Sequence, residues 1–330
     1  MKQNIAIVAG GDSSELVVSL KSAEGIYSFI DKVKYNLYIV LLIKEQWVVR
    51  MADDLLIPID KNDFSFEHES KRVNFDFAYI TIHGTPGENG LLQGYFEMIG
   101  LPYSSCNVLV SALTFNKYFC NHYLKGFGVR VSDSIRLMRG ETVQTEPTVQ
   151  SLALPLFVKP NVGGSSFGVT KVKTADQLQP AIAHAFSEGD EVMIERCIVG
   201  TEITCGCYQS KEKVVVFPLT EVVTDNEFFD YDAKYNGQVE EITPARLSES
   251  ITTAVQALTA KIYKLLGAKG IIRIDYIIEA DGIPTMIEIN TTPGMTATSF
   301  IPQQIRAAGL NIQDVMTDII ENELNNQIIA

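Results

Sequence analysis

The stretch GIIRIDYIIEADGIPTMIEIN, residues 270–290, decides the fold of the last third of the chain. Two strand-like runs flank Asp281-Gly282, a dipeptide typical of tight β-hairpin turns. If these two residues form the turn, Asp275 lies opposite Glu288 and Arg273 opposite Asn290. All four then share one face, because strand side chains alternate. The other face carries isoleucines and is expected to be core: Ile272, Ile274, Ile287 and Ile289.

The polar face of this hairpin is a candidate metal site. Two carboxylates on paired strands repel each other, and a divalent cation removes that repulsion. Asp275, Glu288 and Asn290 supply oxygens that suit Mg²⁺, which binds carboxylates together with substrate phosphates. The alternative is a solvated polar face without an ion. Arg273 on the same face favours a site for an anionic substrate.

The segment after the hairpin, TTPGMTATS (291–299), contains a turn at Pro293-Gly294. Glycine and small hydroxyl residues let backbone N–H groups approach a ligand closely. Such N–H groups can stabilise a developing oxyanion.

A glycine-rich loop, KPNVGGSSFG (159–168), separates two predicted strands, 154–158 and 169–172. It is not a P-loop, because the chain has no GxxxxGK[ST] sequence. A phosphate lid and a plain hairpin loop both fit the pattern. Lys159 favours the lid, since its charge can contact phosphate.

Two further segments carry polar groups whose use stays open. In ERCIVGTE (195–202), Glu195 ends one apolar strand and Glu202 begins the next. These carboxylates can accept hydrogen bonds from nucleotide hydroxyls, or they are ordinary surface acids. FFDYDAKY (228–235) lies in an irregular stretch, 224–245, and is either a loop that closes over a ligand or an ordinary packed loop.

The first hundred residues alternate strand-like and helix-like stretches, which predicts a parallel α/β sheet: 4–9, 14–30, 37–43 and 77–82. Glu15 follows the Gly10-Gly11 turn and should lie at the carboxyl edge of the sheet, where such proteins bind ligands. His83 begins HGTPGENG (83–90) at the same edge, although a lone histidine is more often structural. Further helices are expected at 108–126, 176–188 and 249–266, and further strands at 191–197, 203–208 and 213–219.

Composition narrows the class of protein. The 330 residues suggest two or three domains, and the net charge of −13 without a basic stripe argues against nucleic-acid binding. No run of about 18 apolar residues exists, so we expect no membrane span. The five cysteines are odd in number, and the N-terminus does not read as a signal peptide. We therefore expect a cytoplasmic protein.

Taken together, these stretches resemble the D-alanine:D-alanine ligases of the ATP-grasp superfamily along essentially the whole chain. The matching stretches are GGDSSELVVSLKSA (10–23), HGTPGENGLLQG (83–94), PYSSC and SALTFNKY within 102–118, VKPNVGGSSFGV (158–169), IERCIVGTEIT (194–204), FFDYDAKY (228–235), ITPARL (242–247) and 270–302. The resemblance implies an α/β fold, α+β in its C-terminal part. Its expected parts are a Rossmann-like substrate domain (1–104), a central ATP-grasp subdomain (105–196) and a C-terminal subdomain (197–330).

The resemblance also implies roles for individual residues. Two Mg²⁺ ions, with Mn²⁺ as an alternative, would bind Asp275, Glu288 and Asn290. ATP would be held by Lys117, Lys159, Ser166, Glu195, Glu202 and Lys234. Glu15 would hold the ammonium of the first D-alanine and form a triad with Ser165 and Tyr235 that locks two loops over the site. Arg273 and the Gly294 N–H would stabilise the oxyanion, His83 would lie near the first substrate, and Ser299 would hold the carboxylate of the second.

The implied reaction makes D-alanyl-D-alanine for peptidoglycan through a D-alanyl phosphate, and a homodimer is expected. Gly163, Asn89 and Asn116 depart from residues common in the family, which puts loop rigidity in question. Tyr235 favours the dipeptide over D-alanyl-D-lactate, so a D-alanine:D-lactate ligase or another ATP-grasp carboxylate–amine ligase is the closest alternative. A dinucleotide-binding oxidoreductase lacks its GxGxxG. A non-catalytic nucleotide-binding protein does not explain the intact hairpin face.

Overall fold

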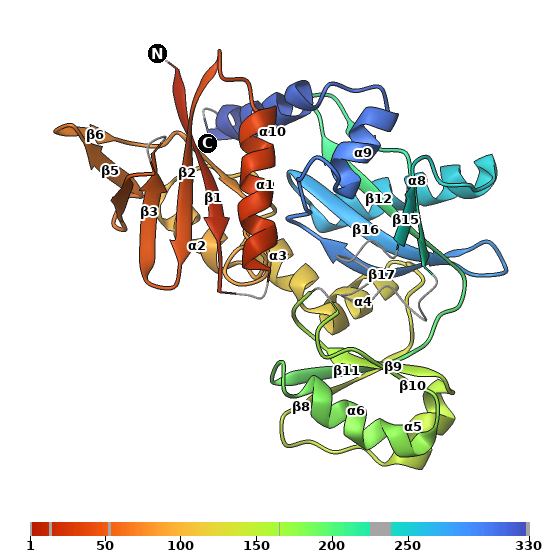
Figure 1. Ribbon diagram of the computed structural model, residues 1–330. Helices are drawn as coiled ribbons and strands as arrows, with labels where there is room; N and C mark the ends of the chain where they lie inside the picture. The colour runs from red at the N-terminus through yellow and green to blue at the C-terminus, as the bar shows by residue number, and fades with distance from the viewer. Residues whose placement is uncertain (1, 13–14, 52–53, 165, 225–238, 328–330) are drawn as a thin grey trace.

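The computed structural model describes residues 2–12, 15–51, 54–164, 166–224 and 239–327, and the strands within them form three sheets. In Figure 1 each sheet belongs to its own part of the molecule, with the first at the left, the third at the right and the second below. No helix in the described ranges is long and apolar enough to cross a membrane.

The first sheet has the order β6-β5-β4-β3-β2-β1-β7. Only its core is parallel, since β1 (Gln3–Gly10) pairs in parallel with β2 (Tyr35–Ile43) and with β7 (Phe77–Ile80). The remaining strands form an antiparallel meander: β3 (Gln46–Arg50), β4 (Leu56–Asp60), β5 (Ser65–His68) and β6 (Lys71–Val73). The expected parallel sheet is thus confirmed for three strands and wrong for the extension. The extension strands have only five, five, four and three residues and none is buried along its whole length, so they give no long buried apolar run in the sequence.

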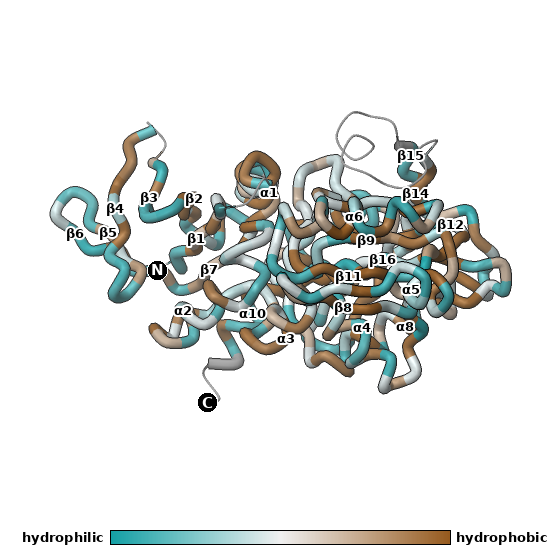
Figure 2. The backbone as a smooth tube through the Cα atoms, turned by 90° about the horizontal axis from the view of Figure 1, so that it is seen from below, coloured by the Kyte–Doolittle hydropathy of each residue, from teal (hydrophilic) through white to brown (hydrophobic). Residues whose placement is uncertain are grey.

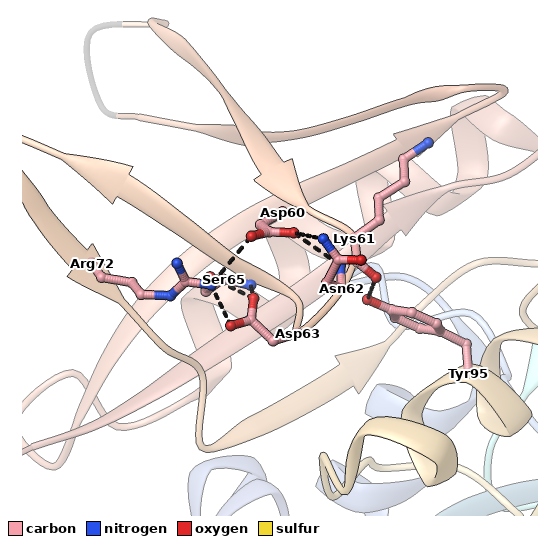
Figure 3. A network of polar contacts seen from close by, with 7 residues as sticks. All are labelled: Asp60, Lys61, Asn62, Asp63, Ser65, Arg72 and Tyr95. Atoms are coloured by element: carbon pink, nitrogen blue, oxygen red, sulfur yellow. Dashed lines mark hydrogen bonds and ion pairs between the residues drawn. The ribbon is translucent and has the colours of Figure 1, made fainter.

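A polar network holds the meander together at its outer end (Figure 3). Asp60 accepts hydrogen bonds from the backbone N–H and the side chain of Asn62, at 3.0 and 2.8 Å. Arg72 on β6 pairs with both Asp60 and Asp63. These groups are exposed, so the pairs contribute little free energy of unfolding and mainly fix the turn geometry.

Helices α1 (Leu16–Phe29) and α2 (Leu91–Ile99) belong to the first part of the chain. The predicted helix 108–126 is in fact two helices, α3 (Val108–Phe115) and α4 (Lys117–Lys125). Asn116 between them has extended backbone, and its side chain accepts a 3.0 Å hydrogen bond from the Phe119 N–H. This N-cap breaks the apolar pattern into two helices and makes Lys117 the first residue of α4.

The second sheet is fully antiparallel, in the order β10-β9-β11-β8. Its strands are β8 (Ser134–Met138), β9 (Leu156–Pro160), β10 (Thr170–Val172) and β11 (Glu191–Arg196). Helix α5 (Thr145–Leu152), the short 3₁₀ turn η1 (Ala175–Gln177) and α6 (Leu178–Ala185) accompany it. Leu178 and Ile182 pack against the strand residues Val158 and Ile194. Figure 2 shows brown, hydrophobic stretches within the strands labelled β11 and β8, next to teal, hydrophilic ones.

The third sheet has the order β15-β14-β12-β16-β17, with β13 also paired to β12. Its strands are β12 (Thr201–Gln209), β13 (Val214–Val216), β14 (Thr220–Thr224), β15 (Val239–Ile242), β16 (Ile271–Ile278) and β17 (Pro284–Asn290). Helix α8 (Glu249–Leu266) has the predicted bounds, since Ser248 caps its start and Gly267, at φ +62°, ends it. Cys205 and Cys207 are buried in β12 as strand core, and all five cysteines are free thiols.

The β16–β17 hairpin confirms the predicted residue pairs, but its turn and its register differ from the prediction. Asp275 lies opposite Glu288 and Arg273 opposite Asn290. The connection is longer than two residues, because the last pair is Ile278 with Pro284, and a bulge between the pairs 275/288 and 276/286 restores the register. The extra residue, Ile287, is therefore only half-buried and lines a cavity, so its assignment to the core was wrong.

The end of the chain returns to the first sheet. After α9 (Phe300–Ala307), helix α10 (Ile312–Gln327) lies beside α1 (Figure 1). Val315, Met316 and Ile319 share one hydrophobic cluster with Ile5 and Ile7 of β1. The first and last elements of the chain therefore build one core.

Candidate active site

Two adjoining cavities lie where the three sheets meet. Cavity A, about 650 Å³, is lined among others by Glu15, His83, Asn290, Gly294 and Ser299. Cavity B, about 530 Å³, is lined among others by Lys159, Ser166, Glu195, Glu202 and Asp275. Four of the candidate site residues line both cavities: Glu15, Lys117, Arg273 and Glu288.

The structure thus gathers thirteen of the sixteen candidate residues around the two cavities. The remaining three, Ser165, Lys234 and Tyr235, lie outside the described residues. The two cavities share a boundary at the polar face of the β16–β17 hairpin. A molecule in one cavity can therefore react with a molecule in the other beside Arg273 and Glu288.

Arg273 is fixed against Asp275 by two parallel hydrogen bonds of 2.9 Å each. Thr204 donates to the same carboxylate at 2.6 Å, and the Asn290 amide nitrogen donates at 3.1 Å. The Arg273 guanidinium also lies 5.4 Å from the centre of the Phe300 ring. Burial lowers the pKa of Arg273, but the charge and hydrogen bonds of Asp275 outweigh it and raise the pKa. Arg273 is therefore a permanent cation with a fixed direction.

Lys117 projects from the start of α4 toward this face. Its Nζ donates to the Gly163 carbonyl at 2.6 Å and lies 3.7 Å from Glu288 Oε2. Asn161, just after β9, accepts hydrogen bonds from the first two backbone N–H groups of α4, at 3.1 Å through its carbonyl and 2.8 Å through its side chain. The helix start, the glycine loop and the acidic hairpin are therefore linked through one lysine.

Lys159 and Glu195 form a buried ion pair of 2.5 Å between β9 and β11. The sequence pointed to each residue separately and missed the pair, because 35 residues separate them and no local pattern links them. A buried pair of this kind needs excellent geometry to offset desolvation. It presents both a cation and a carboxylate to cavity B.

Glu15 lies at the carboxyl edge of the first sheet, immediately before α1. Gly10 makes this turn possible, because a Cβ there would lie 2.1 Å from the Leu42 carbonyl oxygen, and its φ is +118°. A Cβ on Gly164 would lie 3.0 Å from Glu15 Oε2. Glu15 and the glycine-rich loop therefore meet across the cavities, and a larger residue at 164 would displace the Glu15 carboxylate.

His83 is buried after β7, with its Nε2 3.4 Å from Ser22 Oγ. Burial lowers the pKa of His83, Glu15 opposes that effect and Arg273 adds to it. The ring is therefore neutral near pH 7 and can accept or donate one hydrogen bond toward cavity A.

Glu88 also lines cavity A, and no sequence pattern predicted it as a site residue. Its Oε2 accepts a 2.7 Å hydrogen bond from the Gly84 N–H. Burial, with the charge of Glu15 as a second cause, raises the pKa of Glu88 to about 7. The only signal was an acidic residue inside the Gly- and Pro-rich turn HGTPGENG, which is a weak pattern.

The segment 291–299 places Gly294 and Ser299 side by side at cavity A. A Cβ on Gly294 would lie 3.1 Å from Ser299 Oγ. Ser299 is the N-cap residue of α9, and its Oγ accepts from the Thr296 N–H at 3.1 Å instead of capping the helix. The first N–H groups of α9 thus lie beside a hydroxyl, an arrangement that suits a carboxylate.

The oxygen ligands at the hairpin suit Mg²⁺ in kind. Within the described ranges, no group of three or more His, Cys, Asp and Glu side chains could hold a metal alone. The candidate set has two carboxylates and an amide, so a cation would need further oxygens from a phosphate.

Comparisons with known proteins agree over both halves of the chain. A family model described as D-ala D-ala ligase N-terminus matches residues 4–106, and one described as D-ala D-ala ligase C-terminus matches residues 123–321. The chain is 69% identical over 327 residues to a D-alanine–D-alanine ligase of Parabacteroides distasonis, covering 99% of each chain. It is 67% identical to one of Bacteroides fragilis, covering 98% of this chain and 100% of the relative.

Solved structures give the same picture at lower identity. D-alanyl-alanine synthetase A from Vibrio cholerae matches with a TM-score of 0.88 at 27% identity, covering 98% of each chain. VanG D-Ala:D-Ser ligase from Enterococcus faecalis matches with 0.87 at 29% identity, covering 97% of this chain and 99% of the other. The D-alanine–D-alanine ligase of Bacillus anthracis complexed with ATP matches with 0.78 at 31% identity, covering 98% of each chain.

Proposed function

Because the chain belongs to the D-alanine–D-alanine ligase family, we propose that it joins two D-alanine molecules into D-alanyl-D-alanine, with cleavage of one ATP to ADP and phosphate. The observation that carries this proposal is the shared boundary of the two cavities at Arg273 and Glu288. Cavity B is the place for ATP and cavity A the place for the amino acids. The carboxylate to be activated then meets the γ-phosphate at the hairpin face.

In the first step, a carboxylate oxygen of the first D-alanine attacks the γ-phosphorus and ADP leaves, which forms an acyl phosphate. Lys117 and Lys159 hold the phosphates, while Glu195 and Glu202 accept hydrogen bonds from the adenosine. Glu15 binds the ammonium of the first D-alanine, and the neutral His83 lies near that substrate. These groups act through charge and position, so no covalent intermediate with the protein is needed.

In the second step, the amine of the second D-alanine attacks the acyl carbon. Arg273 and the Gly294 N–H stabilise the oxyanion. The bond between the acyl carbon and the phosphate oxygen then breaks, its electron pair leaves with phosphate, and the nitrogen passes its extra proton to that phosphate. Ser299 and the start of α9 hold the carboxylate of the second D-alanine. In this proposal Ser166 completes the site together with three residues that lie outside the described part of the chain: Ser165, Lys234 and Tyr235.

Two Mg²⁺ ions, or Mn²⁺, at Asp275, Glu288 and Asn290 would neutralise phosphate charge. The donor set supports this, since Asn290 uses its amide nitrogen toward Asp275 and keeps its oxygen as the atom that suits a cation. Arg273 holds the Asp275 carboxylate in a fixed direction.

We further propose a cytoplasmic homodimer that serves peptidoglycan precursor synthesis. A second candidate activity differs only in the acceptor, because one structural match is named a D-Ala:D-Ser ligase. D-Serine and D-lactate are therefore the acceptors to compare with D-alanine.

The test is phosphate release from ATP and Mg²⁺ with D-alanine, L-alanine, or D-alanine mixed with D-lactate or D-serine, with products identified by mass. Phosphate release that requires D-alanine and yields D-alanyl-D-alanine is the expected result. A different product would move the assignment to another acceptor. ATP binding without turnover on any of these would refute the substrate assignment.

A further inference from the structure

Two carboxylates at cavity A, those of Glu88 and Glu241, have no role in the two steps above. Burial raises the pKa of Glu88 to about 7, which favours its neutral acid, so Glu241 is the better candidate for binding a cation. Strand β15 pairs with β14 so that Glu241 lies opposite Val222, and β14 pairs with β12 so that Val222 lies opposite Glu202. Directly paired residues share one face of a sheet. Glu241 therefore points to the same side as Glu202, the side on which both cavities lie.

The Glu241 carboxylate is held in place by Gln303 on α9. The Gln303 side-chain nitrogen donates to Glu241 Oε2 and also to the Thr298 carbonyl, the latter at 2.7 Å. Thr298 directly precedes Ser299, so the bridge fixes Glu241 beside the segment that leads into α9. Glu241 is exposed by surface area, but the protein atoms around its carboxylate remove part of its hydration and raise its pKa, while Gln303 and the charge of Arg273 lower the pKa. Glu241 and Arg273 both line cavity A.

These contacts place a negative group next to an anion site. Ser299 and the start of α9 suit the carboxylate of the acceptor, and Glu15 serves the first amino acid. An acceptor amino acid also carries an ammonium, which needs a partner in cavity A. Resting on the proposed function, we propose that Glu241 binds the amino group of the second amino acid and selects acceptors that carry an amino group over hydroxy acids of the same shape.

The selection follows from charge. An ammonium gains a charge-assisted hydrogen bond from a carboxylate, whereas the hydroxyl of D-lactate gains only a weaker one. The carboxylates of D-alanine and D-lactate are alike, so Ser299 and α9 bind both acceptors equally. Glu241 distinguishes them, because it contacts the group in which they differ.

The experiment compares wild type with Glu241→Gln, which keeps the shape and can still accept from Gln303. The matched control is Glu240→Gln, because Glu240 is the adjacent residue on β15, faces the other side of the sheet and lines neither cavity. We would measure kcat and both D-alanine KM values at one pH. We would also measure the ratio of D-alanyl-D-lactate to D-alanyl-D-alanine made from a fixed acceptor mixture.

Glu241→Gln should raise the KM for the second D-alanine by about twofold to fivefold, because solvent screens a charged pair at an exposed carboxylate. It should leave the KM for the first D-alanine unchanged and raise the D-lactate product ratio by a similar factor. Glu240→Gln should change none of these, and Glu241→Asp should restore part of the loss.

Three outcomes would overturn the inference. An unchanged second KM in Glu241→Gln would show that the carboxylate does not contact the acceptor. An equal loss with both acceptors would show a structural role through Gln303. Wild-type protein that forms no dipeptide would overturn the proposed function, and the inference with it, whereas the first two outcomes leave that function intact.

Discussion

Replacing Arg273 with lysine tests the hairpin face most directly. Lysine keeps the positive charge but loses the planar fork that makes two 2.9 Å hydrogen bonds to Asp275. Thr204 and Asn290 still donate to that carboxylate, so Asp275 is not left without partners. The variant should therefore fold, and its defect should be one of position.

The size of the effect can be worked from this geometry. The Arg273 and Asp275 side chains are only 17% and 16% exposed, so solvent screens the pair weakly. Losing one charged hydrogen bond costs about 1.5–3 kcal/mol of unfolding free energy at such a site. Losing one oxyanion donor costs about 10²–10³ in kcat. Because lysine keeps the charge, we expect a loss of about a hundredfold.

Arg246→Lys is the control. Arg246 makes the same forked contact with Glu221, at 2.9 and 2.8 Å, and lines neither cavity. The assay measures ADP formation at saturating ATP and D-alanine, alongside urea unfolding of both variants. Arg246→Lys should lose less stability, since Arg246 is 59% exposed, and should keep wild-type kcat.

Near-wild-type kcat in Arg273→Lys would refute the assignment of Arg273 to the oxyanion. Equal losses of kcat in both variants would also refute it, because the effect would then follow from general destabilisation. Only a loss confined to Arg273→Lys supports the argument.

Four further predictions concern single features. The pKa of Glu88 is raised to about 7, so the folded protein favours the protonated acid. The contribution of this group to the unfolding free energy is fully present below about pH 4 and is lost as the pH rises through 7. Glu88→Gln, which stays neutral, should therefore be more stable than wild type by up to roughly 2–3 kcal/mol between about pH 5 and 8, as thermal unfolding can measure. Asn116→Ala should cost about 1 kcal/mol by removing a helix cap, and should raise the KM for ATP by displacing Lys117, as steady-state kinetics can check. Gly25→Ala would put a Cβ 2.2 Å from the Met295 carbonyl oxygen and should cost about 1–3 kcal/mol in urea unfolding, unlike an alanine at the open Gly189. Chelation of Mg²⁺ should abolish turnover without changing the circular dichroism spectrum, and loss of the spectrum would instead make the ion structural.

The sequence predicted the polar face of the hairpin because alternation along a strand is a local rule. Asp275 and Glu288 are paired as expected, but nothing in the sequence predicts the bulge that allows this pairing. Its extra residue, Ile287, fits the apolar pattern of a core position. Bulges depend on how the whole sheet twists, so the assumption of a two-residue turn gave the correct pairing without the correct turn.

Contacts between residues far apart in the chain could not be predicted from the sequence. The pattern over 108–126 hid the break at Asn116, because asparagine is tolerated inside helices as well as at their caps. The Lys159–Glu195 pair and the Gln303–Glu241 contact arise only once two elements lie side by side. Residue charge and spacing predicted most of the candidate site residues, but the hydrogen bonds and ion pairs between them became visible only in the folded structure.

The shared core of β1 and α10 has a consequence for how the protein is made. Ile5 and Ile7 leave the ribosome about 310 residues before Met316 and Ile319, which complete their cluster. At roughly 10 residues per second, the first strand waits about half a minute with apolar surface uncovered. A transcript cut short before α10 would therefore yield a product with all of the cavity residues described above and an exposed first sheet, a natural substrate for chaperones and proteases.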